Sequence, residues 1–181
     1  MRQYPIYLAL LSLTLFSCGK NEREELVDQV KVFKTAILKN NKQQVADFFT
    51  FPIINNDLKL KAEVTGDHEI KISRLDRKTF LKNYKRIIPS DFNTLFKYLN
   101  IEDFKTQDRL EKTAIPNDKN STCYEGCEIN IENNEITFIF YTNSRKDIIS
   151  TDDDLCPEYS EHWTFKLVDG KLKFKTLGIA G

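Results

Sequence analysis

The sequence is poor in the residues that carry most recognisable chemistry. Its 181 residues include one methionine, one tryptophan, two histidines (His68 and His162) and four cysteines, and its 27 basic residues balance its 27 acidic ones. Balanced charge gives no electrostatic argument for a nucleic-acid partner or for a polybasic contact with a membrane surface. The sequence contains no nucleophile elbow, phosphate-binding loop or paired-carboxylate motif. It therefore offers no signature of an enzyme of those classes.

The longest apolar run lies near the N-terminus and is too short for a transmembrane helix, which needs roughly 20 apolar residues. Arg2 is the only charge before Lys20, and residues 6–16 are apolar except for Ser12 and Thr14. Secretory signals typically begin with a basic residue, continue with a short apolar region and have a small residue before the cleavage site. We therefore expect an exported protein.

The end of this run, Leu15-Phe16-Ser17-Cys18, resembles a bacterial lipobox, in which the cysteine thiol is diacylated and the chain is cut before it. The resemblance implies a signal peptide over residues 1–17, lipid on Cys18, a tether over residues 18–24 and one domain over residues 25–181. Several acyl chains on one cysteine anchor a protein stably. The charged tether resembles that of Bacteroidetes lipoproteins, so we expect the cell envelope, at the outer membrane. The alternative is an ordinary signal peptide with a coincidental cysteine.

Apolar residues recur at helical spacing in the first part of the domain. Glu24–Lys39 has one apolar stripe, acidic residues near its start and a lysine at its end, which suit a helix and its dipole. Asn41 is placed to cap a short second helix. Two further helices are predicted, one capped by Asp76 and one that starts at Ser90 or Asp91.

Alternating patterns predict strands. Residues 57–65 and 68–75 predict a short hairpin, and the segment from Phe104 to Leu110 predicts an edge strand. The turn-forming pairs Asn133-Asn134 and Asp169-Gly170 each stand between two alternating segments, which predicts two long hairpins. Helices followed by antiparallel strands are typical of the α+β class.

Residues 32–52, with their helix, short turn, second helix and Phe51-Pro52, resemble the opening of nuclear-transport-factor-2-like domains. The helix after Asp76 and the hairpin from Gly126 to Phe140 resemble later parts of such domains. The resemblance implies a strongly curved antiparallel sheet wrapped on helices, a cone with an apolar pocket. The expected pocket residues are Phe33, Ile37, Tyr84, Phe138, Phe140, Trp163 and Phe165. Enzymes of this fold, such as isomerases and dehydratases, resemble one another in placing Asp, His or Tyr in the pocket.

Three cysteines remain once Cys18 is assigned to lipid. In an exported protein these cysteines are expected to form a disulfide and not a metal site. The hairpin register places Cys127 opposite Phe140 on the core side, so we expect Cys123–Cys156, with Cys127–Cys156 as the rival pair. A zinc site would need these three cysteines and His162, in a spacing that matches no zinc module. The acidic run 152–154 with Glu158 could offer calcium its oxygens, but it lacks a calcium loop's glycine and spacing.

These observations favour a non-enzymatic, lipid-anchored binding protein of the cell envelope. Its pocket or concave sheet would hold a small apolar ligand or a protein partner. An immunity-type inhibitor of a secreted toxin and a pocket enzyme are the alternatives. Tyr84 lies on the apolar face of its helix, which favours a core role over an acid one. We expect no cofactor, no metal and no nucleic acid.

Overall fold

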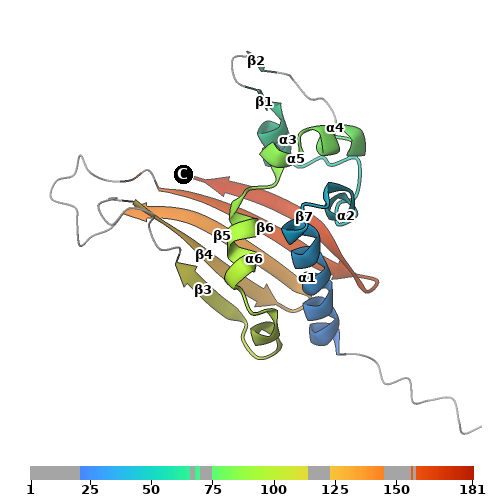
Figure 1. The fold of residues 1–181 in the computed structure, drawn as a ribbon, viewed down its shortest axis with the longest axis vertical. Helices are drawn as coiled ribbons and strands as arrows, with labels where there is room; N and C mark the ends of the chain where they lie inside the picture. The colour runs from blue at the N-terminus through green and yellow to red at the C-terminus, as the bar shows by residue number, and fades with distance from the viewer. Residues whose placement is uncertain (1–20, 66–67, 70–74, 114–122, 145–155, 157) are drawn as a thin grey trace, which may run out of the picture.

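The computed structural model describes residues 21–65, 68–69, 75–113, 123–144, 156 and 158–181. Within them a helical first half is followed by a five-stranded antiparallel sheet in the order β3-β4-β5-β6-β7 (Figure 1). The sheet is open, because β3 and β7 form two separate edges. The α+β prediction is confirmed. The sheet consists of β3 (Arg109–Thr113), β4 (Cys123–Glu132), β5 (Glu135–Ser144), β6 (Tyr159–Val168) and β7 (Lys171–Ala180).

The helical half also contains a two-stranded ribbon, β1 (Val64–Thr65) and β2 (His68–Glu69). The helices are α1 (Glu22–Leu38), α2 (Lys42–Ala46), α3 (Asn56–Glu63), α4 (Arg77–Lys82), α5 (Tyr84–Ile87), α6 (Asp91–Tyr98) and the 3₁₀ helix η1 (Ile101–Lys105).

Helix starts are set by local caps, as the sequence predicted. The Asn41 side chain accepts a hydrogen bond from Gln44 N at 3.1 Å, and the Asp76 side chain accepts one from Thr79 N at 2.7 Å. Such bonds satisfy backbone N–H groups that have no partner within the helix. The helix after Asp76 breaks at Asn83 into α4 and α5, where the sequence predicted one continuous helix.

The prediction of a strand over residues 57–65 is wrong for most of that segment, because α3 occupies it. Leu58 and Ala62, four residues apart, are 0% and 1% exposed, whereas Leu60 is 55% exposed. Asn55 accepts a hydrogen bond from Leu58 N at 2.8 Å, and its amide group donates to Leu177 O of β7 at 2.9 Å. This bond to a distant strand fixes the helix start. The predicted hairpin is seen in the pairing of β1 with β2, and residues 66–67 and 70–74 of the same prediction lie outside the described residues.

The predicted edge strand exists but starts later than expected. Residues 101–105 form η1, in which Phe104 is 1% exposed, and β3 then pairs with β4 from Arg109 onward. Arg23 of α1 holds this connection, since its Nη2 donates to Gln107 O at 2.6 Å and lies 3.0 Å from an Asp108 carboxylate oxygen. The segment therefore packs as a helical turn before it joins the sheet.

The two long hairpins form about the predicted turns. Asn133 has φ of 54°, and Asp169 and Gly170 have φ of 48° and 70°, the positive values that tight hairpin turns require. A Cβ atom at Gly170 would lie 2.7 Å from Glu25 Oε1. The first turn of α1 thus lies against the β6–β7 turn, at one end of the sheet.

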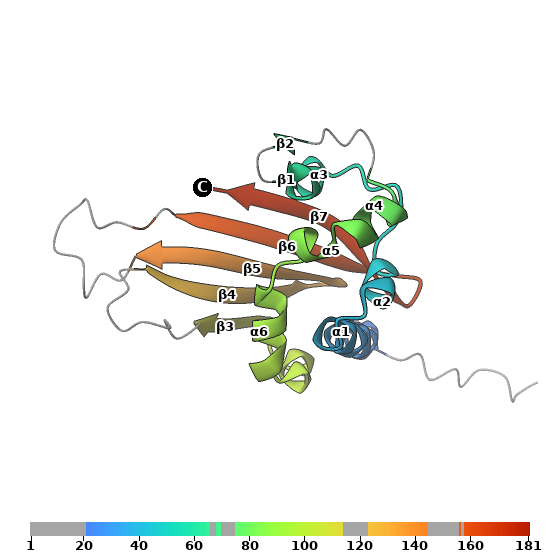
Figure 2. The same cartoon turned by 45° about the horizontal axis from the view of Figure 1, so that its top comes forward.

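The two faces of the sheet differ. Figures 1 and 2 show α1 and α6 lying across the same face, which we call the covered face. Strand residues alternate between faces, and those of the covered face are buried, among them Ile129, Phe138 and Trp163. Their neighbours, such as Thr137 and His162, point to the other face and are partly exposed. No described helix covers this second face, which we call the open face.

Candidate functional site: a hollow on the open face

The residues expected to line an apolar pocket belong to the hydrophobic core instead. Each is 8% exposed or less: Phe33, Ile37, Tyr84, Phe138, Phe140, Trp163 and Phe165. The Phe33 ring centroid lies 4.9 Å from those of Phe165 and Phe48. From α6, the Phe92 ring lies 4.8 Å from Phe140 and 5.6 Å from Trp163. Aromatic rings from α1 and α6 therefore pack on the sheet at the positions where a pocket was predicted.

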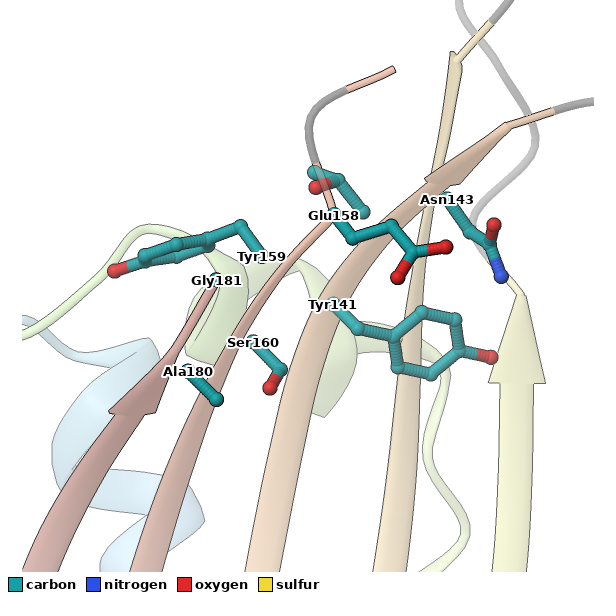
Figure 3. Close-up of a pocket in the computed structure, with 8 residues that line it drawn as sticks. Tyr141, Asn143, Glu158, Tyr159, Ser160, Ala180 and Gly181 are labelled. Atoms are coloured by element: carbon teal, nitrogen blue, oxygen red, sulfur yellow. The ribbon is translucent and has the colours of Figure 1, made fainter. Parts of the chain in front are cut away.

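A hollow of about 330 Å³ lies at one end of the open face, where β5 ends, β6 begins and β7 ends. None of the expected pocket residues lines it. Figure 3 shows the Glu158 side chain pointing toward the ring of Tyr141, with the amide of Asn143 beside them. The lining residues are Tyr141, Thr142, Asn143, Glu158, Tyr159, Ser160, Ala180 and Gly181.

The Tyr141 ring is fixed in place by the neighbouring strands. Tyr141 pairs with Gly126 of β4, and a Cβ atom at Gly126 would lie 2.4 Å from the Tyr141 Cζ atom. The ring therefore lies over the bare backbone of β4, which is possible only because residue 126 has no side chain. The Tyr141 hydroxyl donates to Glu111 Oε1 on β3 at 3.1 Å. The hollow thus has a rigid aromatic wall.

A disulfide holds the rim of the hollow. Cys123 and Cys156 lie at disulfide distance with their Cα atoms 5.6 Å apart, as the sequence predicted, and the rival pair with Cys127 does not form. Cys123 pairs with Ser144 of β5, whose hydroxyl accepts a hydrogen bond from Cys156 N at 2.8 Å. Glu158 follows Cys156 by two residues, so the bridge ties this segment to the start of β4, and the Ser144 hydrogen bond ties it to the end of β5.

A second polar cluster lies on the covered face. The Glu161 carboxylate, 7% exposed, accepts hydrogen bonds from Lys61 Nζ, from the Tyr159 hydroxyl at 2.5 Å and from Trp163 Nε1 at 2.9 Å. Burial alone would raise the pKa of Glu161, but these hydrogen bonds and the charge of Lys61 outweigh it and hold that pKa below its usual value. Three hydrogen-bond donors already hold this carboxylate, which favours a structural role over a catalytic one.

Two more titratable groups lie near this cluster. Burial, and then the charges of Glu125 and Glu161, raise the pKa of Asp91 at the start of α6. Burial raises the pKa of the Cys127 thiol to about 12. A hydrogen bond with the Ile139 backbone lowers this pKa but does not offset the effect of burial. A thiol with this pKa stays protonated at neutral pH and is a poor nucleophile.

The structure separates the residues of the zinc alternative. Cys127 is buried on the covered face, whereas His162 lies on the open face with its Nε2 atom 3.1 Å from Ser160 Oγ. Among the described residues, no group of three or more histidine, cysteine, aspartate or glutamate side chains is arranged to hold a metal ion. Cys18, the side chain of His68 and the acidic run 152–154 lie outside the description.

Apart from Glu158, which was considered only as a calcium ligand, sequence reasoning missed the residues that line the hollow and those of the buried cluster. The inward direction of Glu161 was readable, because it alternates with Trp163 and Phe165 on the same strand. The hollow had no comparable signal, since Gly126 and Tyr141 meet only through strand pairing and Glu158 lies just before β6.

Searches against protein-family models, curated proteins and solved structures found no match. Within the described residues, no helix has the length and apolar composition needed to cross a membrane.

Proposed function

We propose that this protein is a non-enzymatic binding protein, held at the outer membrane of the cell envelope by lipid on Cys18, and that a partner protein docks on its open face. The observation that carries the proposal is the contrast between a filled interior and a rigid surface hollow. A small apolar ligand needs a cavity, whereas the rings of Phe33, Phe92 and Trp163 fill the space over the sheet. A partner protein needs only a surface.

We further propose that the fold is a nuclear-transport-factor-2-like cone whose pocket has been closed by aromatic side chains. The order of elements supports this assignment: two N-terminal helices, a proline-bearing entry, a helical insertion and then long antiparallel strands. An immunity-type inhibitor of a secreted toxin is one form of the proposed function, because it also acts by covering a partner. A pocket enzyme has less support, since Glu161 is held by three hydrogen-bond donors and Cys127 stays protonated.

The anchor is tested by membrane fractionation and mass analysis of the N-terminus. The mature chain should begin at a lipidated Cys18, and Cys18→Ala should leave the protein soluble or unprocessed. Cys127→Ala is the matched control, because it removes a cysteine that lies in the folded core and should not alter membrane retention. Retention of the Cys18→Ala protein in the membrane would refute the anchor.

The docking surface is tested by crosslinking in intact cells. A photoreactive amino acid at Asn143, in the hollow, should crosslink one envelope protein, and Tyr141→Asp should abolish that crosslink. Glu132, at the end of β4 that lies far from the hollow, is the control position. The photoreactive amino acid placed there should give little of this product. Equal crosslinking from both positions would contradict a docking surface at the hollow.

A further inference from the structure

The chemistry of the hollow is aromatic and acidic. Its lining offers the ring of Tyr141 and the carboxylate of Glu158, and no basic side chain is among the lining residues that the structure describes. Glu158 is exposed and has no hydrogen-bond or ion-pair partner among the described residues. Glu111, which accepts the Tyr141 hydroxyl, adds a second negative charge next to the ring. The hollow is therefore complementary to a cation.

The arrangement of ring and carboxylate narrows the kind of cation. A flat guanidinium group can stack on an aromatic face and donate two parallel hydrogen bonds to a carboxylate at its edge. Tyr141 presents a ring fixed over Gly126, and the Glu158 side chain points toward that ring (Figure 3). An ammonium group can also contact a ring and a carboxylate together, as Lys61 does with Trp163 and Glu161, but it has no flat face to stack and no pair of parallel donors.

We propose that the hollow takes an arginine side chain of the partner protein, stacked on Tyr141 and paired with Glu158. This proposal rests on the proposed docking function and adds the chemistry of its central contact. The Cys123–Cys156 disulfide is then a positioning element, because it fixes the rim two residues before Glu158. Buried arginines are among the residues that dominate the energetics of protein interfaces.

The test is a titration of the isotope-labelled full chain in detergent micelles, followed by NMR shifts of backbone amides. The probes are Nα-acetyl-arginine amide and Nα-acetyl-citrulline amide, which have the same shape and differ in charge. The arginine probe should shift the amides of Tyr141, Asn143 and Ser160, and the neutral probe should bind at least fivefold more weakly. Raising the salt concentration should weaken the arginine probe only, because salt screens exposed charges.

Two variants separate the contributions. Glu158→Gln removes the charge with little change in shape, and Tyr141→Leu removes the ring; each should weaken the arginine probe by about two- to fivefold. Glu132→Gln is the control, because it removes an exposed carboxylate at the far end of β4 and should leave the binding unchanged. Since Glu158 is exposed, its variant keeps the test valid if Tyr141→Leu fails to fold.

The outcomes distinguish this proposal from the docking function. If the two probes shift the hollow equally, or if Glu158→Gln leaves the arginine probe unaffected, arginine recognition is wrong even where the Asn143 crosslink persists. If the arginine probe shifts residues elsewhere, the site assignment is wrong. A loss of the crosslink at Asn143 with retained arginine binding would overturn the docking function alone.

Discussion

The same four long strands supply two faces with opposite character, and the difference separates stability from recognition. On the covered face, Phe138, Trp163 and Phe165 are 0% exposed and pack against rings from the helices. On the open face, Thr137, Thr164 and Tyr141 contact mainly their cross-strand neighbours. Because side chains alternate along each strand, neighbouring residues can be changed to affect one property without the other. Five variants test how complete this separation is.

The largest effect should come from Phe33→Ala on the helix side of the covered face. Phe33 contacts the rings of Phe48, Phe92, Phe96 and Phe165, so the change leaves a cavity among rigid aromatic neighbours. We expect a loss of about 3–5 kcal/mol in the free energy of unfolding, measured by urea denaturation. A loss below about 1 kcal/mol would show that the space over the sheet is not tightly filled.

Removal of the disulfide by Cys123→Ala with Cys156→Ala should have a similar but slightly smaller effect. The bridge spans 33 residues, and the chain-entropy model gives about 3–4 kcal/mol for a loop of that size. The reduced wild-type chain is the control and should unfold at the same urea concentration as the double variant. Identical stability of oxidised and reduced protein would contradict the bridge.

Lys61→Met should cost about 3 kcal/mol, because it leaves the buried Glu161 carboxylate without its cation. In the wild type the pKa of folded Glu161 lies below its unfolded value. Its contribution to stability is therefore present above the unfolded pKa of about 4.3 and is lost as the pH falls through the folded pKa.

Unfolding measured across this acidic range should show less pH dependence in Glu161→Gln than in the wild type. Glu132→Gln, which changes an exposed carboxylate, should keep the wild-type profile. An unchanged profile for Glu161→Gln would show that the carboxylate has no depressed pKa in the folded protein.

The smallest effect should come from Thr164→Ala on the open face. Thr164 Oγ1 lies 3.0 Å from Thr137 Oγ1 across the strands, and such pairs contribute about 0.2–1 kcal/mol. Arginine binding at the hollow should not change. A loss as large as that for Phe33→Ala would mean that the open face also carries the fold, and the separation of faces would be wrong.

Local signals predicted most of the fold. Asn41 and Asp76 cap helices through bonds to residues three positions away, and Asp169-Gly170 forms its turn with its own backbone. The segment of α3 was misassigned because Leu58 and Ala62 fit both a helix and an alternating strand. The helix is favoured over the strand by the hydrogen bond of Asn55 with Leu177 of β7, a contact between distant residues that the local sequence does not predict.

The candidate site was far less predictable. The cysteine pair at its rim could be predicted, because hairpin register placed Cys127 toward the core. The wall of the hollow depends on Tyr141 crossing to Gly126, a contact between strands that the sequence does not mark. The sequence identified core residues such as Phe33 and Trp163. Periodicity alone does not reveal whether the side chains of a buried face fill the space above it or leave a cavity.

Because Glu25 lies against the β6–β7 turn, the start of α1 and the hollow are at opposite ends of the sheet. The chain enters α1 at this turn, and the hollow lies at the far end of the same strands, ten residues or about 33 Å away. If the N-terminal side is held at a lipid surface, the sheet acts as a spacer that points the hollow outward. Such an arrangement would favour partners that approach from the surrounding compartment over partners embedded in the same membrane.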